Sequence, residues 1–100
     1  MKSYYLYRHL DTINNVPFYI GVGTNSKNKY YKRSKDKLRR SHEWKEYVKN
    51  TCPNYKVEIL LESNDYSYIS KKEIEFIALY GRKDLNKGTL VNKANGGRGD

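Results

Sequence analysis

Tyr5-Leu6-Tyr7 and Tyr19-Ile20-Gly21 decide the fold expected for this chain, and eleven residues separate the two triplets. The first triplet lies in residues 3–10 and the second in residues 17–23, and in each stretch the side chains alternate in character, as they do in a strand with one apolar face. Residues 11–16 between them are rich in turn-forming side chains. The sequence therefore predicts a β-hairpin.

The two faces of this hairpin differ in chemistry. Leu6 falls on the apolar face, whereas Tyr7 and Tyr19 fall together on the opposite, non-core face. We expect a register with Tyr7 directly across from Tyr19, because a slip of one residue would reverse the faces of one strand. Gly21 and Gly23 are expected to leave a shallow floor beside Tyr19 that another molecule's backbone could approach. The apolar face of the second strand comprises Phe18, Ile20 and Val22.

Composition indicates one small basic domain with a modest core. Twenty Lys and Arg against eleven Asp and Glu give a net charge of +9, which favours a polyanionic partner such as nucleic acid or an anionic membrane surface. No apolar run approaches a membrane span and no signal peptide precedes the first strand, so we expect a cytosolic protein. The single cysteine, Cys52, excludes an internal disulfide and a cysteine-based zinc cage within one chain.

Residues 27–49 carry ten basic and three acidic side chains, a net charge of +7. Tyr30, Tyr31 and Trp44 are interleaved with them, which suits a surface that follows phosphates and stacks on nucleotides. A solvated face would show the same charge, but this segment follows directly on the face with the two tyrosines. A membrane-bound helix is not favoured, because residues 27–40 contain few apolar side chains. The nucleic-acid-binding candidates are Lys27, Lys32, Arg33, Lys35, Lys37, Arg39 and Trp44.

The remaining elements follow from local signals. We expect a short helix over residues 28–33 and a clearer one over residues 41–50, with Ser41 as its N-cap. Residues 55–61 are β-rich and predict a third strand. A helix over residues 67–80 is expected to end at Gly81.

Glu73 falls in the middle of the apolar stripe of this last helix, whereas Glu75 does not. A carboxylate in such a stripe is unfavourable unless it is paired, solvated in a cleft or bound to a cation. One explanation is an ion pair with an arginine or lysine of the basic segment. The other is a Mg²⁺ ligand, since Mg²⁺ prefers hard oxygen atoms and takes few protein ligands. The stripe comprises Ile69, Phe76, Ile77 and Tyr80.

Together these features resemble the GIY-YIG nuclease family, whose signature is a Gly-Ile-Tyr-like triplet followed by Tyr-Ile-Gly. The first triplet here lacks its glycine, whereas Tyr19-Ile20-Gly21 is intact. Family members carry a glutamate on a late helix and an asparagine near the end of the domain, matched by Glu73 and Asn92. The stretch from Tyr80 to Gly96-Gly97-Arg98-Gly99 is also similar to small stand-alone members. The matched positions cover residues 3–99.

The resemblance implies a single α/β (α+β) domain over residues 1–100, with a three-stranded antiparallel sheet flanked by helices. It implies a metal-dependent endonuclease that hydrolyses DNA phosphodiester bonds, with RNA left open as a substrate. Tyr7 or Tyr19 would activate the attacking water, with basic neighbours lowering the phenol's pKa. Glu73 would bind Mg²⁺ or Mn²⁺, and Asn92 would orient Glu73 or a metal-bound water.

One position departs from the family pattern. Lys29 stands where the family typically has an arginine, and lysine lacks the planar guanidinium that grips a phosphate through two bonds. Arg40, followed by Ser41 and then Trp44, resembles an Arg-Ser-x-x-Trp segment of the small members. We therefore expect Arg40 and Lys29 to clamp the phosphate jointly, with Arg33 in reserve.

The two histidines receive less weight. His42 lies close to Arg40 in the sequence and is a reserve catalytic candidate, whereas His9 is expected to be a solvent-exposed bystander.

If no arginine or lysine reaches the scissile phosphate, the chain would be a DNA- or RNA-binding module that has lost cleavage. Sequence specificity would have to come from loops, from the basic segment or from a homodimer.

Overall fold

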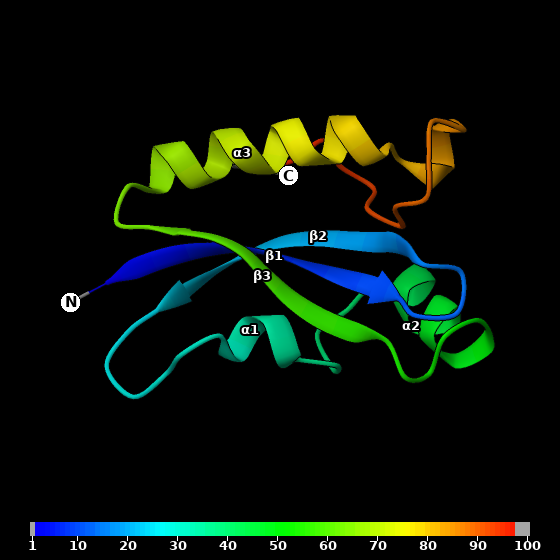
Figure 1. Cartoon of the computed structure of the whole chain (residues 1–100), viewed down its shortest axis with the longest axis horizontal. Helices are drawn as coiled ribbons and strands as arrows, with labels where there is room; N and C mark the ends of the chain where they lie inside the picture. Colours follow the sequence, from blue (N-terminus) through cyan, green and yellow to red (C-terminus); the bar gives the residue numbers. More distant parts are fainter. Residues whose placement is uncertain (1, 98–100) are drawn as a thin grey trace.

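The computed structural model describes residues 2–97 and contains a three-stranded antiparallel sheet with strand order β2-β1-β3. Helices α1 and α2 lie on one face of the sheet and α3 lies on the other (Figure 1). The predicted α+β class is therefore confirmed. The elements are β1 (Ser3–Asp11), β2 (Val16–Asn25), α1 (Lys32–Lys35), α2 (His42–Asn50), β3 (Lys56–Ser63), α3 (Tyr66–Tyr80) and the short 3₁₀ helix η1 (Lys83–Leu85).

The hairpin forms, but its expected register is wrong by two residues. Tyr7 pairs with Gly21, and Tyr19 pairs with His9. A shift of two residues keeps the same side chains on each face. Leu6 therefore still packs in the core that Ile20 joins, and the two tyrosine rings lie diagonally, 6.2 Å apart between centroids.

The hairpin turn and a β-bulge explain this register. The Asp11 carboxylate accepts hydrogen bonds from the backbone N–H groups of Ile13 and Asn14, at 2.8 and 2.9 Å, which keeps the loop short. The pairing then shifts after His9, and Phe18 is the extra residue on β2. The alternation of the sequence does not reveal an inserted residue of this kind.

Both faces of the sheet are buried, so the expectation of a non-core face around Tyr7 is wrong. One apolar cluster lies between the sheet and α3, and the other involves α2. Phe18 belongs to the α2 side rather than to the face of Ile20, because it occupies the bulge. The first cluster comprises Leu6, Ile20, Ile69, Ile77 and Leu90, and the second comprises Phe18, Trp44 and Val91.

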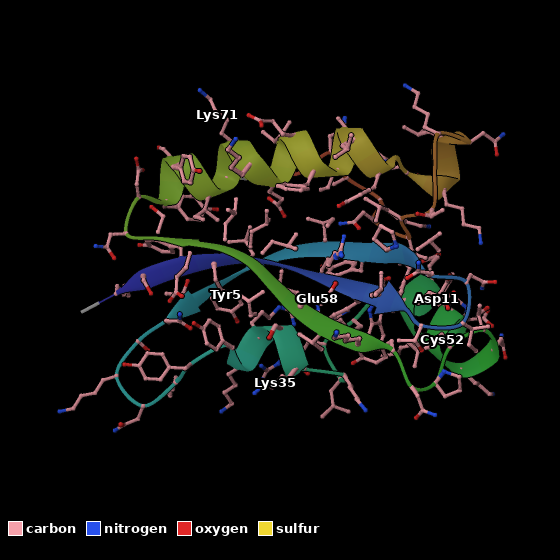
Figure 2. The ribbon with its side chains drawn as sticks, viewed as in Figure 1. Tyr5, Asp11, Lys35, Cys52, Glu58 and Lys71 are labelled. Carbon is pink, nitrogen blue, oxygen red and sulfur yellow. The ribbon has the colours of Figure 1, made fainter. Side chains whose placement is uncertain are left out.

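The strand glycines are covered by tyrosine rings and form no open floor, contrary to expectation. Tyr7 lies across from Gly21 and Tyr5 lies across from Gly23. A Cβ atom at either glycine would overlap the ring of its partner tyrosine. Tyr5 itself lies between the sheet and α1 (Figure 2), where its hydroxyl accepts the backbone N–H of Ser34 at 3.2 Å.

Gly23→Ala is expected to lower the free energy of unfolding by about 1–3 kcal/mol, because the new methyl group would displace the buried Tyr5 ring. Thr24→Ala, on the exposed neighbouring position of the same strand, should change it by less than about 0.5 kcal/mol. Urea unfolding of the two variants measures the difference. Equal stabilities of the two variants would mean that a methyl group at position 23 does not displace the Tyr5 ring.

The helix predictions hold for α2 and α3 but not for α1. The Ser41 hydroxyl accepts the N–H of Trp44 at 3.1 Å and caps α2, and Gly81 ends α3 with φ of 82°. Helix α1 begins at Lys32, later than expected, because Asn28 and Tyr31 adopt left-handed conformations that form a turn. In the part of the chain that the structure describes, no helix is long and apolar enough to cross a membrane.

Candidate active site

A cleft of about 690 Å³ brings together most of the predicted catalytic side chains. Its walls come from β1, β2, the segment 33–41, α3 and the segment 91–97. These segments are far apart in the sequence, and only the folded sheet and its flanking helices bring them together. The predicted residues that line the cleft are Tyr7, Tyr19, Arg33, Arg39, Arg40, Glu73 and Asn92.

Arg40 is a buried side chain of the cleft, with 9% of its surface exposed, and three hydrogen bonds hold it in place. Its Nε donates to the backbone oxygen of Asp36 at 2.7 Å, and its Nη2 donates to that of Arg33 at 2.6 Å. Its Nη1 donates to the hydroxyl of Tyr7 at 2.9 Å. A guanidinium has five N–H groups, so this arrangement fixes Arg40 and leaves it further donors.

Aromatic rings surround the same guanidinium. Its Cζ atom lies 5.6 Å from the ring centroid of Tyr7, 5.2 Å from that of Tyr19 and 5.5 Å from that of Trp44. The negative faces of aromatic rings attract a cation, so they help to keep this charge in a partly dehydrated site. Arg40 and the two tyrosines, each predicted as a catalytic residue, thus lie next to one another.

Tyr7 does not have the environment expected of a general base. Burial raises the pKa of the Tyr7 phenol well above its ordinary value, and the nearby Tyr19 acts in the same direction. Arg40 acts in the opposite direction but does not outweigh burial. The expectation that basic neighbours lower this pKa is therefore wrong for Tyr7, which is 1% exposed. Tyr19 lines the same cleft and is only half-buried.

Glu73 projects from α3 into the cleft, where it is half-buried. It lies between the turns that carry Ile69 and Ile77, both buried in the core. Its Oε1 accepts the backbone N–H of Gly97 at 3.0 Å, so the C-terminal segment lies against the carboxylate. Lys71, by contrast, points away from the sheet on the outer side of α3 (Figure 2).

The donor set suits a Mg²⁺ ion that shares its coordination with a substrate. Among residues 2–97, Glu73 is the only acidic side chain that lines the cleft, and no cluster of three His, Cys, Asp or Glu side chains is found. Mg²⁺ keeps several waters and is commonly held by one or two carboxylates together with substrate phosphates. A single carboxylate in an open cleft fits that mode, and it does not fit a closed protein cage.

Asn92 lines the cleft, but its amide is used differently from the prediction. Its Oδ1 accepts the backbone N–H of Ile20 at 3.0 Å, and its Nδ2 donates to the backbone oxygen of Ile20 at 2.8 Å. These two bonds attach the C-terminal segment to the edge of β2. Asn92 therefore positions the C-terminal segment, whose Gly97 packs on Glu73.

Several predicted residues lie outside the cleft, namely Lys27, Lys29, Lys32, Lys35, Lys37, His42 and Trp44. Lys29 is exposed in the turn after β2, so it cannot share the role of Arg40 as expected. His42 is exposed on α2, where its Nε2 lies 2.9 Å from Oε1 of Glu46. Trp44 is 2% exposed and cannot stack on a nucleotide, because its indole packs in the α2 core. The tail residues Arg98 and Gly99, part of the resemblance, lie outside the described residues.

His9 is the supporting residue that the sequence reading missed. It is fully buried rather than exposed. Its Nε2 donates to the backbone oxygen of Ser34 at 2.8 Å, and its Nδ1 accepts the indole N–H of Trp44 at 2.9 Å. Its position on the same strand face as Tyr5 and Tyr7 gave no sign of burial, because that face was expected to be non-core. The cleft also contains Tyr66 and Lys93, which no motif singled out.

Stability is expected to fall as the pH drops from about 6.5 towards 4, because burial lowers the pKa of His9 to about 4. The unfolded chain then binds a proton that the folded chain does not, so the stabilising contribution is complete above pH 6.5 and decreases below it. The loss approaches about 3 kcal/mol near pH 4. Urea unfolding at several pH values should show a flatter profile for His9→Gln, whereas His42→Gln should keep the wild-type profile. A wild-type profile for His9→Gln would contradict this assignment.

Comparisons of the chain with protein-family models, with curated proteins and with solved structures find no match. The resemblance to GIY-YIG nucleases therefore stays a prediction from the sequence motifs of this chain.

Proposed function

We propose that the chain is a metal-dependent endonuclease that hydrolyses phosphodiester bonds of DNA. The observation that carries the proposal is the convergence of Tyr7, Tyr19, Arg40 and Glu73 in one cleft. Phosphodiester hydrolysis needs an oriented water, a cation near the charge that builds up on phosphorus, and stabilisation of the leaving oxygen. The cleft contains a side chain suited to each of these tasks.

Arg40 is the group suited to contact the scissile phosphate. Its guanidinium is held on three sides by hydrogen bonds to Asp36, Arg33 and Tyr7. Because it is fixed before substrate arrives, little rearrangement is needed when charge accumulates on the phosphate oxygens. Arg33 and Arg39 line the same cleft and add positive charge at its rim. The predicted joint role of Lys29 is not retained, because Lys29 lies elsewhere.

The two tyrosines divide the remaining work. Tyr7 is buried and its hydroxyl accepts a hydrogen bond from Arg40, so it positions the guanidinium. Tyr19 is less buried and orients the attacking water. Water adds to phosphorus and the bond to the 3′ oxygen breaks, leaving a 3′ hydroxyl and a 5′ phosphate. Glu73 would hold Mg²⁺, which supplies positive charge for the leaving oxygen.

Tyr19→Phe is expected to lower the cleavage rate by a factor of about 10²–10⁴, since its hydroxyl contacts the water, and to leave stability nearly unchanged. Tyr7→Phe should have a smaller effect on the rate and should lower the free energy of unfolding by about 1.5–3 kcal/mol, because it removes a bond to a charged group. Single-turnover cleavage and urea unfolding measure both effects. A larger rate loss in Tyr7→Phe than in Tyr19→Phe would reverse the two roles.

The reaction type can be tested through its products. Supercoiled plasmid nicked by the purified protein in Mg²⁺ is incubated with a DNA ligase, which seals only nicks with a 3′ hydroxyl and a 5′ phosphate. We expect the nicks to be sealed. Nicks that become sealable only after phosphatase and kinase treatment would exclude the proposed bond cleavage.

A further inference from the structure

A second, more basic groove adjoins the catalytic cleft. It has a volume of about 910 Å³ and runs from the end of β2, through the turn after it, to α1 and the loop beyond. Val22, Thr24, Arg33 and Arg39 line both the groove and the cleft. A chain-like ligand could therefore pass from one into the other without leaving the surface.

The charge of the groove is almost entirely positive. Among the described residues, Asp36 is its only acidic lining side chain. That carboxylate accepts the N–H groups of Leu38 and Arg39 and forms ion pairs with two arginines of the same segment, which offsets its charge. Such a lining matches a polyanion with regularly spaced charges. The basic residues that line the groove are Lys29, Lys32, Arg33, Lys35 and Arg39.

The groove also displays one aromatic ring to solvent. Tyr30 lines it and is 65% exposed. The neighbouring Tyr31 is fixed, since its N–H donates to Oδ1 of Asn25 and its hydroxyl donates to Oε1 of Glu62, both at 2.8 Å. Its ring also packs edge-on against Tyr5, with centroids 5.1 Å apart. The turn is therefore anchored through Tyr31, and the ring of Tyr30 remains available to a ligand.

We propose that this groove binds an unpaired nucleic-acid strand leading to the cleft, with its phosphates along the basic side chains and one base stacked on Tyr30. The inference rests on the proposed function and names its substrate: a strand that is single-stranded on one side of the scissile phosphate. Stacking on an aromatic side chain requires an exposed base face, which a continuous duplex does not offer. The groove is therefore expected to prefer an unpaired strand over a duplex. Contacts to phosphates alone would not distinguish the two.

Fluorescence anisotropy with labelled oligonucleotides in EDTA tests binding without cleavage. The probes are oligothymidine, oligouridine and a DNA duplex of the same length. Tyr30→Ala is expected to weaken binding of the unpaired probes by about tenfold and to leave duplex binding unchanged. Tyr30→Trp should retain wild-type affinity. Tyr68→Ala removes an exposed tyrosine that lies beside a lysine on α3, outside the groove, and should have no effect.

Each outcome decides the inference independently of catalysis. Equal effects of Tyr30→Ala on duplex and unpaired probes, or no effect on either, would overturn it. Tighter binding of oligothymidine or of oligouridine identifies DNA or RNA as the strand that fits. If binding of the unpaired strand depends on Tyr30 but the protein does not cleave DNA in Mg²⁺, the strand-binding role of the groove is supported and the proposed nuclease activity is refuted. If the protein cleaves duplex DNA and Tyr30→Ala has no effect on cleavage, the nuclease activity is supported and the strand-binding role of the groove is refuted.

Discussion

Glu73→Ala is expected to lower the DNA cleavage rate in Mg²⁺ by a factor on the order of 10³, while DNA binding in EDTA stays within about twofold of wild type. Glu73 is the only carboxylate among the described residues that line the cleft, so its removal leaves that part of the site without a hard anionic ligand. Binding depends instead on the basic side chains and should persist. Single-turnover cleavage of a plasmid and anisotropy of a labelled oligonucleotide measure the two quantities.

Glu75→Ala is the matched control for this variant. Glu75 lies on the same helix, is exposed, and pairs with Lys72 on the outer surface at 3.2 Å. Its removal changes the net charge of the protein by the same amount as removal of Glu73. Equally impaired cleavage by the two variants would show that the loss of negative charge, and not the position in the cleft, lowers the rate. Glu73 would then lose its assigned role.

Arg40→Lys is expected to lower the cleavage rate by a factor of about 10²–10³, even though the positive charge is kept. The guanidinium donates in three directions, to Asp36, Arg33 and Tyr7. An ammonium group on a flexible stem cannot reproduce this planar arrangement. Arg40→Ala should in addition lower the free energy of unfolding by about 2–4 kcal/mol, since it leaves buried acceptors without their donor. Cleavage is measured well below the melting temperature of each variant.

Arg39→Ala is the control that distinguishes the fixed position of the Arg40 guanidinium from the positive charge of the segment in general. Arg39 directly precedes Arg40 in the sequence, and its side chain is 87% exposed. Its replacement should weaken DNA binding modestly and change stability by less than about 0.5 kcal/mol. If Arg40→Lys cleaved at the wild-type rate and Arg39→Ala were impaired, the contact with the scissile phosphate would be assigned to the exposed Arg39 instead of the buried Arg40.

Much of the fold could be predicted because local signals agreed with the tertiary structure. Three strands, the Ser41 cap of α2 and the Gly81 end of α3 follow from alternation, capping and turn chemistry. The register could not be predicted in the same way, since the bulge at Phe18 depends on how the hairpin turn closes. The position of α1 depends on left-handed residues, Asn28 and Tyr31, that also had no clear sequence signal.

Some residues of the cleft could be predicted from the sequence, but their environments could not. Periodicity placed Glu73 beside Ile77 on one stripe of α3, and the structure confirms that arrangement. The burial of His9 and Trp44 was not predicted. The indole N–H of Trp44 donates to Nδ1 of His9, so each polar group has a partner inside the protein. The exposure preferences of single residue types cannot indicate such a pair. The side-chain bonds of Asn92 to β2 likewise depend on a long-range approach of the chain to a sheet edge.

The most direct test of the central claim is cleavage of supercoiled plasmid by the purified protein in Mg²⁺ and in EDTA, with binding to the same DNA followed at low and high salt. The proposed site predicts nicked and linear products in Mg²⁺ only, and salt-sensitive binding in both conditions. Salt-sensitive binding without cleavage at any Mg²⁺ or Mn²⁺ concentration would contradict it. The chain would then be a nucleic-acid-binding module in which Arg40 and Glu73 share a cleft without performing hydrolysis.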